Sequence, residues 1–176
     1  VASRFCIAMI SSSLTAIILP LDCSAASSAC SPRAGFPMRM AVATVSGFST
    51  GCPSTISGGY PTTCTLTGGA SLVVTGTGSI ATTPANPAII VLGTAGSISN
   101  SGLISGTVTG IAVNSATMTG GISNDGTISG VSYGIGIYTS TITGTINNSG
   151  TILNGINIVN GVVDAIDNSG LLGDSY

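Results

Sequence analysis

The sequence predicts an all-β protein that folds as a right-handed parallel β-helix, a solenoid in which the chain winds through successive coils. A unit of 20–24 residues recurs in the C-terminal half, and a repeat of this length is typical of such folds. Within the unit, aliphatic residues alternate with small or polar ones, which is the period of a β-strand. Charged residues make up only 5% of the 176 residues, and the absence of Lys and Glu disfavours exposed helices.

The composition also excludes several functional classes. Hydrophobic residues make up 43% of the chain, too many for a disordered protein. The three cations, all Arg, lie within the first 39 residues, so we expect no nucleic-acid partner. The chain has no His, so it lacks the imidazole of a His/Cys metal site or of a Ser-His-Asp triad. We therefore expect neither a metal nor a cofactor.

Residues 1–26 have the features of a signal peptide. Arg4 precedes an apolar run at residues 5–21, and small residues follow at residues 24–26. The run contains Ser and Pro and is shorter than the about 20 apolar residues of a transmembrane helix. These features favour a cleaved signal peptide over a retained anchor or a buried core segment, and they predict an exported protein.

Residues 27–65 lack periodicity and are predicted to form an irregular N-terminal extension or cap. They contain Cys52 and Cys64, which lie in a stretch rich in Pro and Gly. In an oxidising compartment, a disulfide between these two residues is favoured over free thiols, and the segment offers too few ligands for zinc. Residues 66–97 contain a less regular version of the repeat and are predicted to form the first, irregular coils.

Residues 98–176 contain the regular repeat, four copies of Ile-X-Asn-[Ser/Asp]-Gly-X-[Ile/Leu] whose Asn residues are 24, 24 and 20 positions apart. Because Asn and Gly tolerate a positive φ, we expect this element to turn the chain at a corner of each coil. Aligned Asn side chains are also expected to hydrogen-bond along the axis as a ladder. The predicted turn ladder comprises Asn100, Asn124, Asn148, Asn168, Gly102, Gly126, Gly150 and Gly170.

The aliphatic residues of the repeat are predicted to stack in columns inside the solenoid. Each buried side chain contributes about 1.5–3 kcal/mol, so the columns are expected to be the main stabilising term. A further column is expected to join Met118, Ile142 and Val162. The alternative, a β-sandwich with the repeat as its hairpin turn, predicts turns about every 8–12 residues without long-range identity. The predicted core stack comprises Ile98, Ile122, Ile146, Ile166, Ile104, Ile128, Ile152 and Leu172.

The leader followed by low-charge coils with the Ile-X-Asn-Ser-Gly-X-Ile unit resembles the N-terminal part of an autotransporter passenger of type V secretion. The resemblance covers the leader and residues 66–176. It implies a non-enzymatic stalk or adhesin at the cell surface or outer membrane of a Gram-negative-like cell, or secreted from it. It also implies a ligand on a host or neighbouring cell, and a C-terminal outer-membrane β-barrel that is missing here. Either this chain is therefore a truncated portion, or the resemblance is to a shorter surface protein.

A carbohydrate-active β-helix is the first alternative function. Such an enzyme needs a pair of carboxylates, for which Asp164 and Asp167 are the candidates if they converge in a groove. We expect these residues and Asp125 to lie in solvated positions instead. The single Asp125-Gly126 pair is also too little for a repeated calcium site.

An ice-binding solenoid is the second alternative function. It requires a flat Thr array, for which Thr117, Thr119 and their equivalents 24 residues later are candidates. The array is expected to stop at the next coil, where Gly161 and Val163 are predicted to take the equivalent positions.

The two ends of a short solenoid are expected to be open. Each end exposes strand edges whose main-chain groups lack partners. We therefore expect the isolated chain to self-associate through its open coil ends.

Overall fold

The computed structural model describes residues 5–9, 16–23, 30–32, 52–83 and 86–173, and these residues form strands and turns without a helix. No helix that is long and apolar enough to cross a membrane is present in these ranges. The chain divides into two units, Val1–Phe48 and Ser49–Tyr176.

In the first unit, three strands form an antiparallel sheet in the order β1-β2-β3. The strands are β1 (Phe5–Met9), β2 (Ala16–Cys23) and β3 (Cys30–Pro32). The predicted signal peptide includes β1 and β2, whereas its cleavage region at residues 24–26 and most of the predicted extension lie outside the described residues. The signal peptide therefore stays a prediction.

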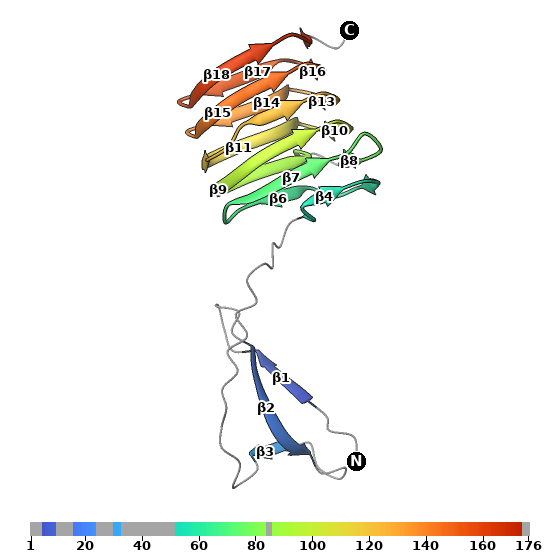
Figure 1. Cartoon of the computed structure of the whole chain (residues 1–176), viewed down its shortest axis with the longest axis vertical. Helices are drawn as coiled ribbons and strands as arrows, with labels where there is room; N and C mark the ends of the chain where they lie inside the picture. Colours follow the sequence, from blue (N-terminus) through green and yellow to red (C-terminus); the bar gives the residue numbers. More distant parts are fainter. Residues whose placement is uncertain (1–4, 10–15, 24–29, 33–51, 84–85, 174–176) are drawn as a thin grey trace. The chain divides into compact units, whose positions relative to one another are not determined.

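The second unit is a β-solenoid of about five turns, which confirms the predicted fold class. All strand pairs in it are parallel, and the coils lie one above another (Figure 1). Each complete coil has three faces, which the chain visits in the order face 1, face 2, face 3.

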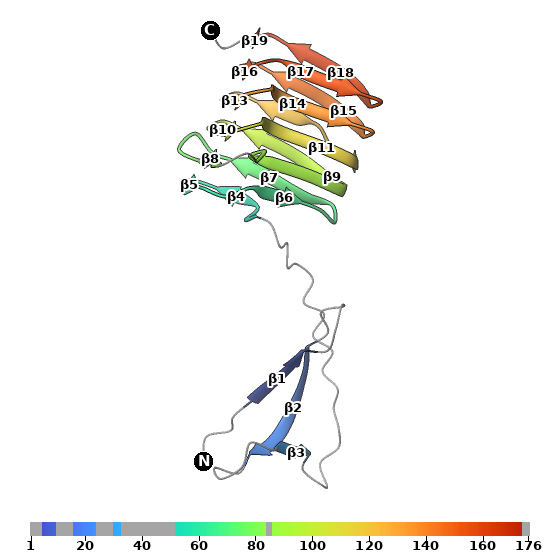
Figure 2. The same ribbon diagram turned by 180° about the vertical axis from the view of Figure 1, so that it is seen from behind.

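Face 2 is a six-stranded sheet, visible along one side of the solenoid in Figure 2. Its strands are β5 (Gly59–Tyr60), β8 (Ser79–Ala81), β10 (Leu103–Gly106), β13 (Thr127–Gly130), β16 (Thr151–Leu153) and β19 (Leu171–Gly173).

Faces 1 and 3 belong to one ten-stranded sheet because β9 (Ile89–Asn100) and β11 (Thr109–Met118) pass from face 3 to face 1 without a break. The other strands of face 1 are β4 (Thr55–Ile56), β7 (Ala70–Val74), β12 (Ile122–Asn124), β15 (Thr141–Asn148) and β18 (Val162–Asn168). The other strands of face 3 are β6 (Cys64–Leu66), β14 (Tyr133–Tyr138) and β17 (Ile156–Val159).

The register confirms the predicted repeat. On face 1, Ile98 pairs with Ile122, which pairs with Ile146. On face 2, Ile104 and Ile128 pair in the same way, and both are fully buried. Stacked strands about 4.8 Å apart thus bring identical aliphatic side chains into contact, which fills the interior.

The solenoid begins earlier than the sequence predicted. Residues 55–65, assigned to an irregular extension, form the first coil together with Leu66, through β4, β5 and β6, which pair with β7, β8 and β9. Residues 66–97 also belong to the solenoid, since Leu72 pairs with Ile98 and Ile80 with Ile104, and the predicted irregularity appears as a register shift between Ala70 and Leu72. Main-chain pairing requires no sequence identity, so these coils form although their sequences do not repeat.

Two members of the predicted core stack are not buried. Ile166 and Leu172 occupy the expected columns, but they are 43% and 41% exposed. They belong to the last coil, and no further described coil lies on its outer side. The other six members are buried as predicted.

The column predicted to join Met118, Ile142 and Val162 has a different last member. Ile142 pairs with Val163, which packs against the core, whereas Val162 is exposed. The last repeat is shorter because residues are lost in two places, one between faces 2 and 3 and the other between Ile142 and Thr145, where a register shift lies. Val162 lies as far before Asn168 as Ile142 lies before Asn148, so the repeat spacing assigned Val162 to Ile142, whereas the structure pairs Ile142 with Val163.

The asparagine motif turns the chain for a different reason from the one predicted. Its Asn and Gly residues are absent from the described positions with positive φ. A positive φ occurs instead at the corner between faces 3 and 1. It is found there in Gly93 (66°), Ser115 (47°), Thr139 (48°) and Asn160 (52°).

The glycines of the motif are required by close approach of the backbone. A Cβ atom on Gly126 would meet the carbonyl oxygen of Gly102, one coil below, and a Cβ atom on Gly150 would meet that of Gly126. Gly170 repeats this relation with Gly150, and Gly102 repeats it with Gly78, a position outside the predicted motif. The glycine column therefore allows the coils to stack at this corner.

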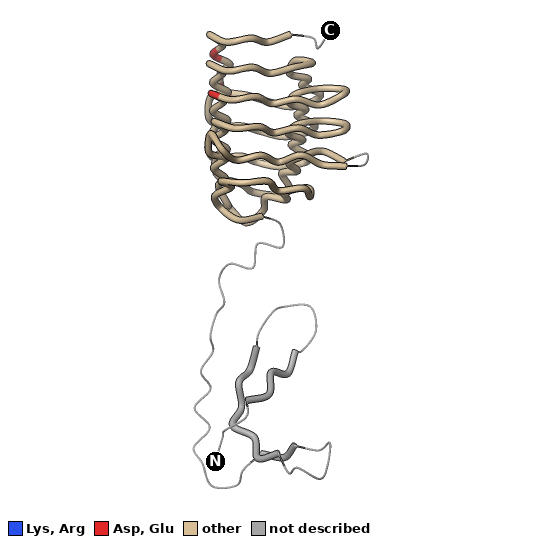
Figure 3. Tube along the Cα trace, turned by 90° about the vertical axis from the view of Figure 1, so that its right-hand side faces the viewer, with Lys and Arg blue, Asp and Glu red and all other residues tan. Residues whose placement is uncertain are grey.

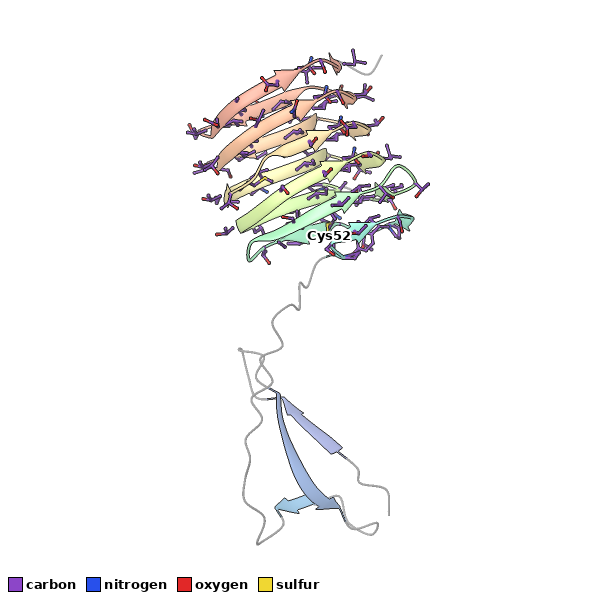
Figure 4. All side chains as sticks on the ribbon, viewed as in Figure 1. Cys52 is labelled. Atoms are coloured by element: carbon purple, nitrogen blue, oxygen red, sulfur yellow. A yellow bond between two sulfur atoms is a disulfide. The ribbon has the colours of Figure 1, made fainter. Side chains whose placement is uncertain are left out.

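Cys52 and Cys64 form a disulfide, as the sequence predicted, with their Cα atoms 5.0 Å apart. Cys64 is fully buried in β6 and pairs with Ile89 of the next coil. Figure 4 places Cys52 at the N-terminal end of the solenoid. The disulfide thus holds together the segment that forms the first coil.

We expect Gly126→Ala to lower the free energy of unfolding by about 1–3 kcal/mol, because the added methyl group meets main-chain atoms that cannot move aside. Gly76→Ala is the matched control. Its Cβ would meet only the Ser101 carbonyl oxygen, at 3.9 Å. Urea denaturation followed by circular dichroism measures both, and equal effects of the two changes would contradict the close-approach explanation.

We expect reduction of the Cys52–Cys64 disulfide to destabilise the solenoid by about 3 kcal/mol, the value for closing a loop of this size in the unfolded chain. Urea denaturation with and without dithiothreitol measures the difference. In the double variant Cys52→Ser/Cys64→Ser, dithiothreitol should have no such effect. If dithiothreitol still destabilised this double variant, the destabilisation would have to come from other cysteines.

Candidate functional site

The most distinctive feature of the solenoid is a ladder of asparagine side chains at the corner between faces 1 and 2. Asn100, Asn124 and Asn148 end β9, β12 and β15, and all three are buried. Asn100 Nδ2 donates to Asn124 Oδ1 at 2.7 Å, and Asn124 Nδ2 donates to Asn148 Oδ1 at 2.7 Å. Asn148 Nδ2 donates to Asn168 Oδ1 at 2.6 Å. The predicted ladder is confirmed.

Main-chain oxygens complete the bonding of each buried amide. The Nδ2 atoms of Asn100 and Asn124 lie 3.1 Å from the carbonyl oxygens of Thr127 and Thr151 in the next coil. Asn148 has the same relation to Leu171, also at 3.1 Å. All buried side-chain nitrogen and oxygen atoms among the described residues have a hydrogen-bond partner. The cost of burying these amides is thereby offset.

The ladder occupies only part of its column. Below Asn100, the equivalent positions are held by Val74 and Ile56, which are buried and apolar. At the other end, Asn168 is exposed. The column therefore accepts either apolar side chains or asparagines. The repeat alone did not predict that apolar residues occupy this column before Asn100, because the earlier coils lack the asparagine motif.

A second buried polar contact joins the coils at the corner between faces 3 and 1. The Ala116 N–H donates to Ser140 Oγ at 3.0 Å. The Ser140 hydroxyl lies within hydrogen-bond distance of the Val113 carbonyl oxygen (3.1 Å) and the Tyr138 carbonyl oxygen (2.7 Å). Sequence reasoning missed this residue because it occurs once, next to the irregular corner.

Three aspartates are the only charged residues in the described part of the solenoid. Figure 3 shows red acidic positions on the tube of the solenoid and no blue Lys or Arg there. Asp125 is exposed and accepts a hydrogen bond from Ser149 Oγ at 2.6 Å. Asp164 and Asp167 are both exposed on a single strand, β18. These positions agree with the predicted solvated role. The described residues contain no group of three or more His, Cys, Asp or Glu that could hold a metal ion.

The threonine array is short. Thr94, Thr117 and Thr141 pair in successive coils, and Val162 follows them, rather than the predicted Gly161. In the neighbouring column, the Thr119 hydroxyl donates to the Ala95 carbonyl oxygen at 3.2 Å. The Thr143 hydroxyl bonds to Met118 in the same way. These hydroxyl groups thus connect one coil to the next.

The two tyrosines of β14, Tyr133 and Tyr138, differ in their surroundings. Tyr133 is 37% exposed at the start of β14, next to the exposed Val131. Tyr138 is half-buried, and its ring lies over Gly136, where a Cβ atom would meet it at 2.7 Å. Tyr133 is therefore the more accessible of the two.

Comparison of the chain with protein-family models, with curated proteins and with solved structures gave no match. The described residues establish a β-solenoid held together by an asparagine ladder. The resemblance to autotransporter passengers continues to rest on the leader and the repeat, and it stays a prediction.

We expect Asn124→Leu to lower the free energy of unfolding by about 1–3 kcal/mol, because it leaves a buried amide oxygen of Asn148 without its donor. Apolar residues fit elsewhere in the column, so steric strain is not the cause. Asn168→Leu, at the exposed end, is the matched control, with an expected loss below about 0.5 kcal/mol. Urea denaturation measures both, and an equal loss would contradict a special role for buried members.

Asn124→Asp adds a test by pH. A carboxylate here would face the Oδ1 atom of Asn148, so burial and this oxygen raise the pKa of the new carboxyl group above its unfolded value of about 3.9. The loss of stability of this variant relative to the wild-type chain is therefore smallest below about pH 4, where the new carboxyl group is protonated in both the folded and the unfolded state. It grows as pH rises toward the folded-state pKa. A deficit independent of pH would contradict this environment.

Proposed function

We propose that the chain is a non-enzymatic, exported surface protein, part of an autotransporter passenger, in which the solenoid acts as a stalk or adhesin. The observation that carries the proposal is the asparagine ladder. It joins four successive coils through asparagine side chains, three of which are buried. Each added coil extends such a rod by about one strand spacing, 4.8 Å.

Two features support export. The leader at residues 1–26 has the charge and apolar run of a signal peptide. The Cys52–Cys64 disulfide is of a kind that persists in secreted proteins and is rare in a reducing cytosol.

The composition of the surface supports a rod that contacts other surfaces through polar and aromatic groups. The described solenoid has no Lys or Arg, and its outward positions are rich in Ser and Thr. Tyr133 and Val131 provide an exposed apolar contact on one side. A ligand on a host or neighbouring cell is the partner we propose for such a surface.

Expression of the full chain in a Gram-negative host tests export. We expect the chain to leave the cytoplasm, to lose about residues 1–26 by mass spectrometry, and to resist thiol alkylation at Cys52 and Cys64 before reduction. A chain that begins at residue 27 is the matched control and should stay cytoplasmic with both thiols reactive. Recovery of the full chain uncleaved and reduced in the cytoplasm would refute the proposal.

A further inference from the structure

We propose that Asn147 is an acceptor site for an N-linked glycan, and that the folded solenoid carries this glycan on the outer surface of face 1. Asn147, Asn148 and Ser149 form the sequence Asn-X-Ser, the acceptor motif for N-linked glycans in exported proteins. Of the ten asparagines in the sequence, only Asn147 has Ser or Thr two residues later. Glycosylation at this residue goes beyond the proposed role of the solenoid as a stalk or adhesin.

The alternation of side chains along β15 directs Asn147 to solvent. Asn147 is exposed, whereas its neighbours Ile146 and Asn148 are buried. It lies within the stack, because it pairs with Ser123 in the coil before and with Asp167 in the coil after. Both of these residues are exposed as well. The exposure of Asn147 therefore comes from the outer surface of face 1 and does not depend on an end of the solenoid.

The side chains around Asn147 leave room for a bulky group. Thr145 precedes it on the same side of β15, and Ser149 follows it at the turn. Across the strands it lies between Ser123 and Asp167. All four are short and polar, so a glycan attached to Asn147 extends into solvent without displacing the core.

The fold keeps the buried ladder asparagines out of this chemistry. The close approach of the coils requires Gly two residues after each of them, as at Gly126 and Gly150. The acceptor motif requires Ser or Thr at that position. A ladder asparagine therefore cannot belong to the motif without breaking the stack, and modification of Asn147 leaves the ladder intact.

The structure also indicates when the sugar is transferred. In the folded chain, β15 pairs with β12 on one side and with β18 on the other. The Ser149 hydroxyl donates to Asp125 Oδ1 at 2.6 Å. These contacts hold the motif in place, whereas in the unfolded chain it is free to enter a transferase. Transfer therefore precedes the stacking of the coils, and the completed fold then accommodates the glycan.

The reaction requires a donor sugar that carries a good leaving group. The donor is an oligosaccharide joined through a diphosphate to a membrane lipid, which an exported chain passes as it crosses the membrane. Asn147 Nδ2 forms a bond to the anomeric carbon of the first sugar. The bond from that carbon to the diphosphate oxygen breaks, and the lipid diphosphate leaves with the bonding electron pair. The nitrogen releases one proton, and neither partner is oxidised or reduced.

Expression of the full chain in a eukaryotic host, behind that host's own secretion leader, tests the site. The host supplies the transferase and the lipid-linked oligosaccharide, and its leader supplies export, so the result does not depend on residues 1–26. Peptide-N-glycosidase in heavy-oxygen water converts a glycosylated asparagine into a labelled aspartate. We expect this label at Asn147, in the fragment released by cleavage before Asp125 and Asp164, in chain collected from cells and medium.

Two serine variants test the dependence on the motif. Ser149→Ala should abolish the label, because the motif loses its hydroxyl group. Ser169→Ala is the matched control and should leave the label unchanged, since Ser169 takes the same corner position one coil later but follows Asp167. Absence of the label from the unchanged chain, or its persistence in Ser149→Ala, would overturn the proposal.

Two further variants test the outward placement. Ser99→Asn creates a second motif with Asn100 and Ser101, in the same column two coils before Asn147, and should gain a second glycan. Asn147→Gln provides the chain without the glycan, and its Tm and circular dichroism spectrum should equal those of the glycosylated chain. A glycan in Ser99→Asn at the new position alone, or a lower Tm for the glycosylated chain, would contradict the proposed site.

Discussion

Hydrogen bonding between coils is the interaction on which the whole solenoid depends. Each strand pairs with the equivalent strand one coil away, so any polar group that points inward must also find its partner along the axis. An asparagine side chain has both a donor and an acceptor, so a column of identical asparagines can satisfy itself. Asn100, Asn124 and Asn148 do this while fully enclosed. A column of ionised aspartates would lack the donor.

The corners of the coil show how the same stacking is achieved with different residues. At the corner between faces 1 and 2, the backbones of adjacent coils approach so closely that only glycine fits at Gly102, Gly126 and their equivalents. At the corner between faces 3 and 1, the chain turns through a left-handed conformation, and Thr139 and Ser115 adopt it despite the cost for residues with a side chain. The corner between faces 1 and 2 therefore restricts residue type through lack of space, whereas the corner between faces 3 and 1 restricts it through the backbone conformation.

The two ends of the solenoid are chemically unlike. The first coil has buried inward residues, including Ile56 and Cys64, and the disulfide lies beside them. The last coil exposes its inward residues and ends the ladder with Asn168. Repeat proteins commonly have terminal units that differ from the internal ones, because only a modified unit can face solvent. The first coil has such modifications, while the last described coil keeps the Asn-X-Gly motif of the coils before it.

The sequence by itself determined the parts that depend on identity between coils. The asparagine column and the buried Ile98 and Ile104 columns could be predicted, because stacking in register places identical residues at a regular interval. The Cys52–Cys64 pair could be predicted for a different reason, because two cysteines in a short stretch rich in Pro and Gly favour a disulfide in an oxidising compartment. The early coils, the true partner of Ile142 and the role of the glycines were decided by the tertiary structure. Main-chain pairing carries no sequence signature, a shortened repeat can lose residues at any corner, and a close approach exists only between assembled coils.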